Sequence, residues 1–275
     1  MVSEPVTDPS SPIPVEPHQE LVCLIAHGAC EFVATLLLLL TVMGGFAALI
    51  APLGESLPQT VLLAALVGIV VTLIARSPIG KLSGAHMNPA ISLAFWMQGR
   101  LASTELTVYV LMQFAGAITA CGLLSVVLPT QFQAIGFGVL SPVPDDGIVR
   151  ILVLEGGATA GLVVVLFYTL SHKNLTRYAA VSIGAYLTVL TFLLAPLTGA
   201  SFNPARAYGA AFFAQQLDGQ WPYYIAPMLG GITASVLLQR HVLKLPKPLY
   251  HRLNQCHVHS NYTWNVAQRL WRNLR

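Results

Sequence analysis

Two stretches of the sequence share one pattern: Ser83-Gly84-Ala85-His86-Met87-Asn88-Pro89-Ala90 and Thr198-Gly199-Ala200-Ser201-Phe202-Asn203-Pro204-Ala205-Arg206. In each stretch, Asn-Pro-Ala follows a loop that contains small residues. Asn is a favoured helix N-cap, and Pro is favoured at the first helical position because its missing N–H would have no partner there. One copy would indicate only an ordinary helix start. Two copies at corresponding places of an apolar chain predict two matching short helices.

The composition excludes an ordinary soluble globule. Of the 275 residues, 55% are apolar and 9% are charged, and the mean hydropathy is +0.67. An average soluble domain carries about 25% charged residues. Long uncharged runs, such as Phe32 to Ala51 and Val61 to Ala75, indicate contact with lipid. We therefore expect an integral membrane protein.

Six apolar segments are long enough to span a bilayer. They cover residues 24–50, 60–75, 106–128, 148–170, 178–197 and 222–242. Two further segments, 88–97 and 203–214, begin at the Asn-Pro-Ala motifs and are too short to span. Such segments fit re-entrant half-helices, which membranes tolerate where the broken backbone is buried in protein or lines a cavity. The predicted fold is an all-α membrane protein with six transmembrane helices and two re-entrant half-helices.

The distribution of basic residues predicts the orientation. Of the 14 Lys and Arg residues, all but Arg150 and Arg206 fall on one side when the N-terminus is placed in the cytoplasm. Both termini are therefore expected to be cytoplasmic. The glycosylation sequons at Asn174 and Asn261 would then face the cytoplasm and carry no glycan.

The chain divides into a membrane domain and two tails. Residues 1–21 are polar and Pro-rich, which predicts a disordered tail. Residues 22–240 form the membrane domain, and residues 241–275 form a basic tail. The end of this tail alternates apolar and basic residues, so it is either an amphipathic helix on anionic lipid or a solvated cytoplasmic segment.

The membrane domain is internally duplicated, with repeats at about residues 22–128 and 148–240. The first and fourth spans both carry a Glu followed four residues later by Thr, at Glu31 and Glu155. The third and sixth spans share a run of small residues that allows close helix packing. Three spans per repeat make the two repeats run in opposite directions across the bilayer. The half-helices therefore enter from opposite faces.

The two motif loops resemble the signature loops of the major intrinsic protein (aquaporin) family, and the resemblance covers residues 22–240. It implies that the half-helices meet near the bilayer centre, that six spans surround a narrow pore, and that four such monomers form a homotetramer in a cell membrane. It also implies that Glu31 and Glu155 anchor backbone N–H groups of the motif loops. Facing helix N-termini concentrate positive potential, which opposes cations and protons. The amides of Asn88 and Asn203 would donate hydrogen bonds to passing water.

An Arg at membrane depth is costly unless it lines water. Arg206 holds the third helical position of the second half-helix, where the first has Ile91. The family resemblance places Arg206 at a constriction together with Thr191 and Ala200. The second span adds Val67 if the alignment with the family allows one inserted residue, or Gly68 if it does not.

This constriction lacks the His and Phe of water-selective members, so it is expected to be wider and less polar than theirs. We expect a passive channel for water and for small neutral solutes such as hydrogen peroxide, urea, ammonia or glycerol. Glycerol-conducting members carry Asp directly after the Arg, whereas this chain has Ala207, which weakens the case for glycerol.

Several alternatives remain. A junction or scaffold protein on the same fold would show little transport. His86 is either a pH-sensitive gate or a structural loop residue. No enzyme, cofactor or nucleic-acid partner is predicted. Cys256-His257-Val258-His259 lacks a second ligand pair, so no metal site is predicted either.

Overall fold

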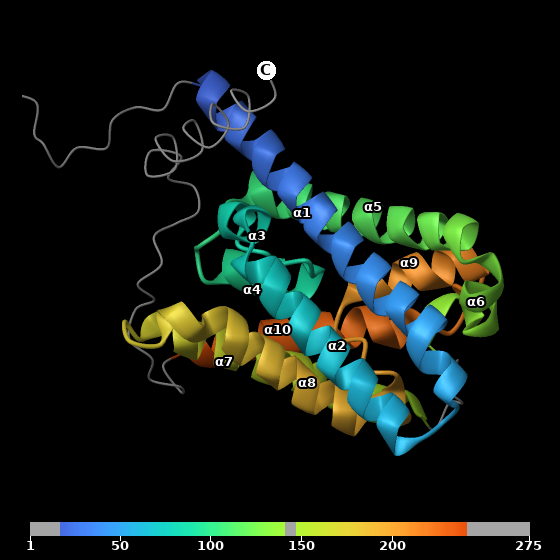
Figure 1. Ribbon diagram of the computed structural model, residues 1–275. Coiled ribbons are helices and arrows are strands. Elements are labelled where there is room, and N and C mark those ends of the chain that lie inside the picture. Colours follow the sequence, from blue (N-terminus) through green and yellow to red (C-terminus); the bar gives the residue numbers. More distant parts are fainter. Residues whose placement is uncertain (1–16, 141–146, 241–275) are drawn as a thin grey trace, which may run out of the picture.

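The computed structural model describes residues 17–140 and 147–240 (Figure 1). Within these residues the chain forms helices and loops, and no strand. The helices are α1 (Pro17–Gly45), α2 (Leu57–Arg76), α3 (Pro78–Ser83), α4 (Pro89–Met97), α5 (Ser103–Val127), α6 (Pro129–Ala134), α7 (Ile148–Ser171), α8 (Ala179–Thr198), α9 (Pro204–Ala214) and α10 (Trp221–Gln239). The predictions for residues 1–16, for the basic tail, for Asn261 and for the segment at Cys256 lie outside the described residues.

Six long helices and two short helices that begin at the motifs confirm the predicted fold class. Five of the long helices are long and apolar enough to cross a membrane. The sixth, α10, has 19 residues and opens with the less apolar run Trp221-Pro222-Tyr223-Tyr224. The short helices α3 and α6 were not predicted, although each begins with Pro at its first helical position.

Corresponding helices of the two repeats pack in corresponding ways. In the first repeat α1 packs along α5, in the second α7 packs along α10, and α2 of the first packs along α8 of the second. Small residues permit each close approach. A Cβ at Gly116 would lie 2.6 Å from the carbonyl oxygen of Phe32, and one at Gly68 would lie 2.5 Å from that of Gly184. A Cβ at Gly230 of α10 would likewise overlap the carbonyl oxygen of Gly156 on α7, which confirms the predicted tight packing of the third and sixth spans.

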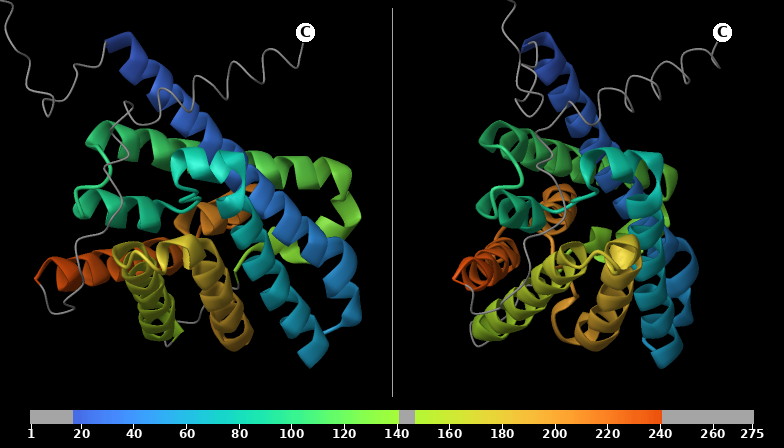
Figure 2. Two further views of the ribbon diagram at one scale, coloured as in Figure 1. Left: turned by 60° about the vertical axis from the view of Figure 1, so that its left-hand side comes forward. Right: turned by 90° about the vertical axis from the view of Figure 1, so that its left-hand side faces the viewer.

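Each short helix packs against long helices of the other repeat as well as its own. The first, α4, packs against α10 and α7, and the second, α9, packs against α5. Buried apolar residues fill both contacts, with Ile91 and Phe95 next to Ala234, and Ala210 next to Ala117. Figure 2 shows α9 lying among the long helices rather than outside them. The two repeats are thus interlocked through α4 and α9.

Candidate functional site

The two Asn side chains of the motifs join the starts of α4 and α9. Asn88 Oδ1 accepts a hydrogen bond from the N–H of Ala90 at 2.9 Å, and its Nδ2 donates to the carbonyl of Phe202 at 2.7 Å. Asn203 Oδ1 accepts from the N–H of Ala205 at 3.0 Å, and its Nδ2 donates to the carbonyl of Met87 at 2.7 Å. Each Asn therefore caps its own helix and binds the opposite loop.

This crossed arrangement differs from the expected one in part. The sequence predicted amides that face passing water, but one N–H of each amide is used between the loops. An amide nitrogen carries two N–H groups, so one remains. Both Asn88 and Asn203 line a cavity, so a solute there can meet only the N–H that is not used between the loops.

The loops before the motifs share an uncommon backbone conformation. After a Gly with positive φ in each, Ala85 (φ 52°) and Met87 (φ 50°) in the first loop match Ala200 (φ 48°) and Phe202 (φ 50°) in the second. A non-Gly residue in this left-handed region costs of order 1–3 kcal/mol and persists only where the surroundings hold it. The surrounding structure must therefore stabilise both loops.

Two buried carboxylates supply that stabilisation. Glu31 accepts hydrogen bonds from the hydroxyl of Ser83 (2.7 Å), the N–H groups of His86 (2.9 Å) and Met87 (2.7 Å), and the side-chain amide of Gln113 (2.7 Å). Glu31 and the four residues that donate to it are almost completely buried.

The second repeat has the same device. Glu155 accepts from the hydroxyl of Thr198 (2.6 Å) and from the N–H groups of Ser201 (3.1 Å) and Phe202 (2.6 Å). Each carboxylate thus binds two backbone N–H groups of the loop that precedes its half-helix. Charge-assisted bonds of this kind are the stronger hydrogen bonds of proteins.

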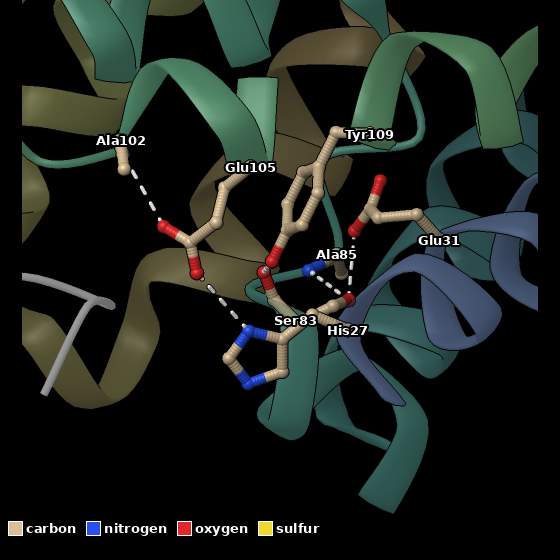
Figure 3. A network of polar contacts seen from close by, with 7 residues as sticks. All are labelled: His27, Glu31, Ser83, Ala85, Ala102, Glu105 and Tyr109. Atoms are coloured by element: carbon tan, nitrogen blue, oxygen red, sulfur yellow. Dashed lines mark hydrogen bonds and ion pairs between the residues drawn. The ribbon is translucent and has the colours of Figure 1, made fainter. Parts of the chain in front are cut away.

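Further polar contacts lie beside the first loop, and one of them, from Tyr109, reaches it (Figure 3). Tyr109 donates its hydroxyl to the carbonyl of Ser83 at 2.7 Å. His27 Nδ1 lies 3.3 Å from Glu105 Oε1, and Glu105 Oε2 accepts from the N–H of Ala102 at 3.2 Å. Sequence analysis missed His27, Glu105 and Gln113, although a polar residue inside an apolar run was the available signal.

His86 lies between these groups and the cavity. Its Nδ1 is 3.1 Å from the Ser92 hydroxyl, and its ring packs against Phe95 and Tyr109 with centroid separations of 4.3 and 5.2 Å. Nε2 is buried and has no hydrogen-bond partner among the described residues. His86 also lines the cavity. The geometry is that of a packed loop residue with one free ring nitrogen near the cavity.

A cavity of about 560 Å³ runs past both motif loops. Its lining includes Val67, Thr191, Ala200 and Arg206, so the structure brings the predicted constriction residues to one cavity. Gly68, the alternative to Val67, does not line it and instead packs against Gly184 of α8.

A second cavity of about 440 Å³ shares Arg206 with the first and is also lined by Arg150, Leu140 and Tyr223. Arg206 therefore lies where the two cavities meet. Its Nη1 is buried and has no hydrogen-bond partner among the described residues. An unpaired guanidinium donor at this point can bind a solute that enters the cavity.

No group of three or more His, Cys, Asp or Glu side chains suited to a metal ion occurs in the described part of the chain. The carboxylates near the motifs, Glu31 and Glu155, bind loop N–H groups and neighbouring polar side chains.

Comparisons with known proteins agree with this geometry. The sequence profile described as "Major intrinsic protein" matches residues 21–238. The fold is similar to the X-ray structure of the aquaglyceroporin from Plasmodium falciparum, with a TM-score of 0.69 and 19% identity over 80% of this chain and 98% of that one. At that identity the likeness shows the fold alone. The profile match covers most of the chain and begins and ends close to the predicted membrane domain, and on that ground the chain belongs to the major intrinsic protein family.

Proposed function

We propose that this protein is a passive membrane channel for water and small neutral solutes. The observation that carries the proposal is the pair of cavities that meet at Arg206 and pass the opposed starts of α4 and α9. Two helix N-termini at one place concentrate positive potential, which disfavours cations and hydrated protons. The positive potential imposes no such penalty on a solute without net charge. Family membership supports the same reading, since the matched family is one of membrane channels.

The constriction of the proposed channel consists of Val67, Thr191, Ala200 and Arg206. Val67 and Ala200 are small and apolar, and the Thr191 side chain is short. The Arg206 donor offers hydrogen bonds to a carbonyl or hydroxyl oxygen. We infer that urea, ammonia and hydrogen peroxide permeate in addition to water. Glycerol is expected to permeate more slowly, because Ala207 replaces the Asp of glycerol-conducting members.

The same reasoning extends to topology and assembly. We propose that the ends bearing Arg76, Lys81, Arg100, Lys173, Arg177 and Arg240 face the cytoplasm of a cell membrane, with both termini on that side. Residues 22–240 would act as the channel unit, flanked by cytoplasmic tails. A homotetramer is proposed by family resemblance.

Permeability measurements test the channel directly. Purified protein is reconstituted into phosphatidylcholine vesicles, and stopped-flow light scattering records shrinkage in sucrose and swelling in urea or glycerol gradients. Wild-type vesicles should pass water and urea faster than protein-free vesicles, and a pH-sensitive dye inside should report no added proton leak. A junction or scaffold protein without transport would leave the vesicles as tight as protein-free ones.

The matched variant is Thr191→His, which replaces a short side chain at the constriction by a larger one. It should reduce urea permeation more than water permeation. Equal reduction of both solutes would contradict the assignment of Thr191 to the constriction.

A further inference from the structure

Three basic side chains line the larger cavity at the end away from Arg206. Arg76 ends α2, Lys81 lies in α3, and Arg177 lies in the single turn Thr176–Tyr178 before α8. Arg76 is nine positions after Val67 on the same helix, which is about 14 Å along the axis. We call these three residues the basic mouth.

The fold brings their three elements together. The hydroxyl of Thr72 on α2 lies 3.4 Å from the carbonyl oxygen of Ala180 on α8, so the end of α2 meets the start of α8. A Cβ at Gly80 would lie 2.9 Å from the Cα of Ala75, so α3 folds back closely on the end of α2. The three cations therefore project from one small region around the cavity.

Their charge is not neutralised by the described residues. Among the described residues, no carboxylate lines either cavity, and the contact between His27 and Glu105 lies outside both linings. The guanidinium of Arg177 lies over the ring of Tyr178, 4.7 Å from its centroid. A contact of this kind leaves the positive charge of the guanidinium without a carboxylate partner.

The positive-inside tendency alone does not account for this placement. It requires basic residues on the cytoplasmic side but not in the wall of a cavity. Lys173, in the loop that also contains Arg177, is exposed, like the three residues of the basic mouth, but does not line the cavity. The residues of the basic mouth are thus distinguished from their basic neighbour by position.

We propose that Arg76, Lys81 and Arg177 bind a phosphate group, and that the bound group obstructs permeation. Two guanidinium groups and one ammonium match the oxygens of a phosphate, to which Arg binds through two parallel N–H donors. Because the three side chains line the cavity itself, a ligand held among them lies in the path of the solute. Obstruction rests on the proposed channel function, whereas binding does not. The phosphate belongs either to a soluble ion or ester or to the headgroup of an anionic phospholipid.

Binding is tested first, without transport. Scintillation proximity with radiolabelled inorganic phosphate compares detergent-purified wild-type protein with Arg177→Gln, Lys81→Gln and the triple variant that adds Arg76→Gln. Each substitution should lower the affinity about tenfold, as loss of one charge-assisted hydrogen bond does. Lys173→Gln is the matched control and should keep wild-type affinity. Equal binding by wild type and triple variant, with elution profiles showing both folded, would overturn the site for soluble phosphate.

Transport then separates the two sources of phosphate. Water permeability is measured in phosphatidylcholine vesicles with phosphate or chloride at equal ionic strength and osmolarity, and in chloride with phosphatidylglycerol added to the bilayer. If water permeability is lower in phosphate than in chloride, and the triple variant abolishes the difference, the ligand is soluble. If water permeability is lower with phosphatidylglycerol, and the triple variant abolishes that difference, the ligand is a headgroup. If the vesicles conduct water and neither phosphate nor phosphatidylglycerol changes their permeability, the inference is refuted and the proposed channel function stands. Vesicles that conduct no water would refute the channel and leave binding to decide the site.

Discussion

Replacing Glu31 by Gln removes a charge that holds the first motif loop while keeping the side chain's size. Glu31 now accepts from Ser83, His86, Met87 and Gln113. If the new NH2 group takes the place of Oε1, the Ser83 hydroxyl can rotate and accept from it, but the N–H of His86 loses its acceptor. If it takes the place of Oε2, Gln113 can turn its unpaired Oε1 toward it, but the N–H of Met87 loses its acceptor.

Either orientation leaves one buried backbone N–H without a partner, at a cost of about 1–3 kcal/mol. The same N–H groups hold Ala85 and Met87 in their left-handed conformation, so the loop loses part of the force that opposes its strain. The neutral amide is easier to bury than a carboxylate, which limits the loss to this range. We expect Glu31→Gln to unfold at a lower temperature, by about 2–4 °C per kcal/mol, and to conduct less water.

The assay combines thermal unfolding in detergent, followed by intrinsic fluorescence, with stopped-flow permeability at matched protein density. Glu155→Gln should behave in the same way, because Ser201 and Phe202 stand in the positions of His86 and Met87. Thr107→Val, at an exposed position of α5, is the control and should match the wild type within error. Wild-type melting and wild-type permeability in both Glu variants would refute the role given to these carboxylates.

Three further outcomes are expected. Gly68→Val should lower stability by about 1–3 kcal/mol, because its Cβ would overlap the carbonyl oxygen of Gly184. Gly157→Ala, with no atom within 4 Å of its Cβ, should be neutral or stabilising by up to about 1 kcal/mol. Equal melting temperatures of the two variants would contradict the close α2–α8 contact. His27→Leu should destabilise by about 1–3 kcal/mol in the same melting assay, since Glu105 Oε1 stays buried and loses its His27 partner. His27→Leu combined with Glu105→Leu should recover part of that loss. Arg206→Val should raise the urea permeability of reconstituted vesicles by widening the constriction, and an unchanged ratio of urea to water permeability would argue against its placement there.

Features set by local chemistry could be predicted from the sequence. The half-helices, expected at 88–97 and 203–214, begin at Pro89 and Pro204, because a capping Asn followed by Pro fixes a helix start within a few residues. The length and apolar content of the six spans are likewise read along a single segment. The first span was the least accurate, since α1 already begins at Pro17 in a polar stretch that hydropathy does not mark.

Features that depend on distant residues could not be predicted in this way. The amide of Asn88 binds the carbonyl of Phe202, 114 positions away, and no local pattern indicates that contact. The choice of Val67 over Gly68 as the constriction residue needed the position of α8, because Gly68 packs against α8. The left-handed conformation of Met87 was also hidden, since such positions usually indicate Gly or Asn.

The exchange of α4 and α9 between the repeats has a consequence for biosynthesis. When translation has produced α1 to α6, α4 lacks α7 and α10, and the Asn88 amide lacks the carbonyl of Phe202. The first repeat can enter the membrane at that stage, but the conformation of its motif loop has no support from the other side. Contacts that span more than 100 residues form late, because a long loop must close before they contribute. The early half should therefore remain open to chaperones and proteases until α10 has been made.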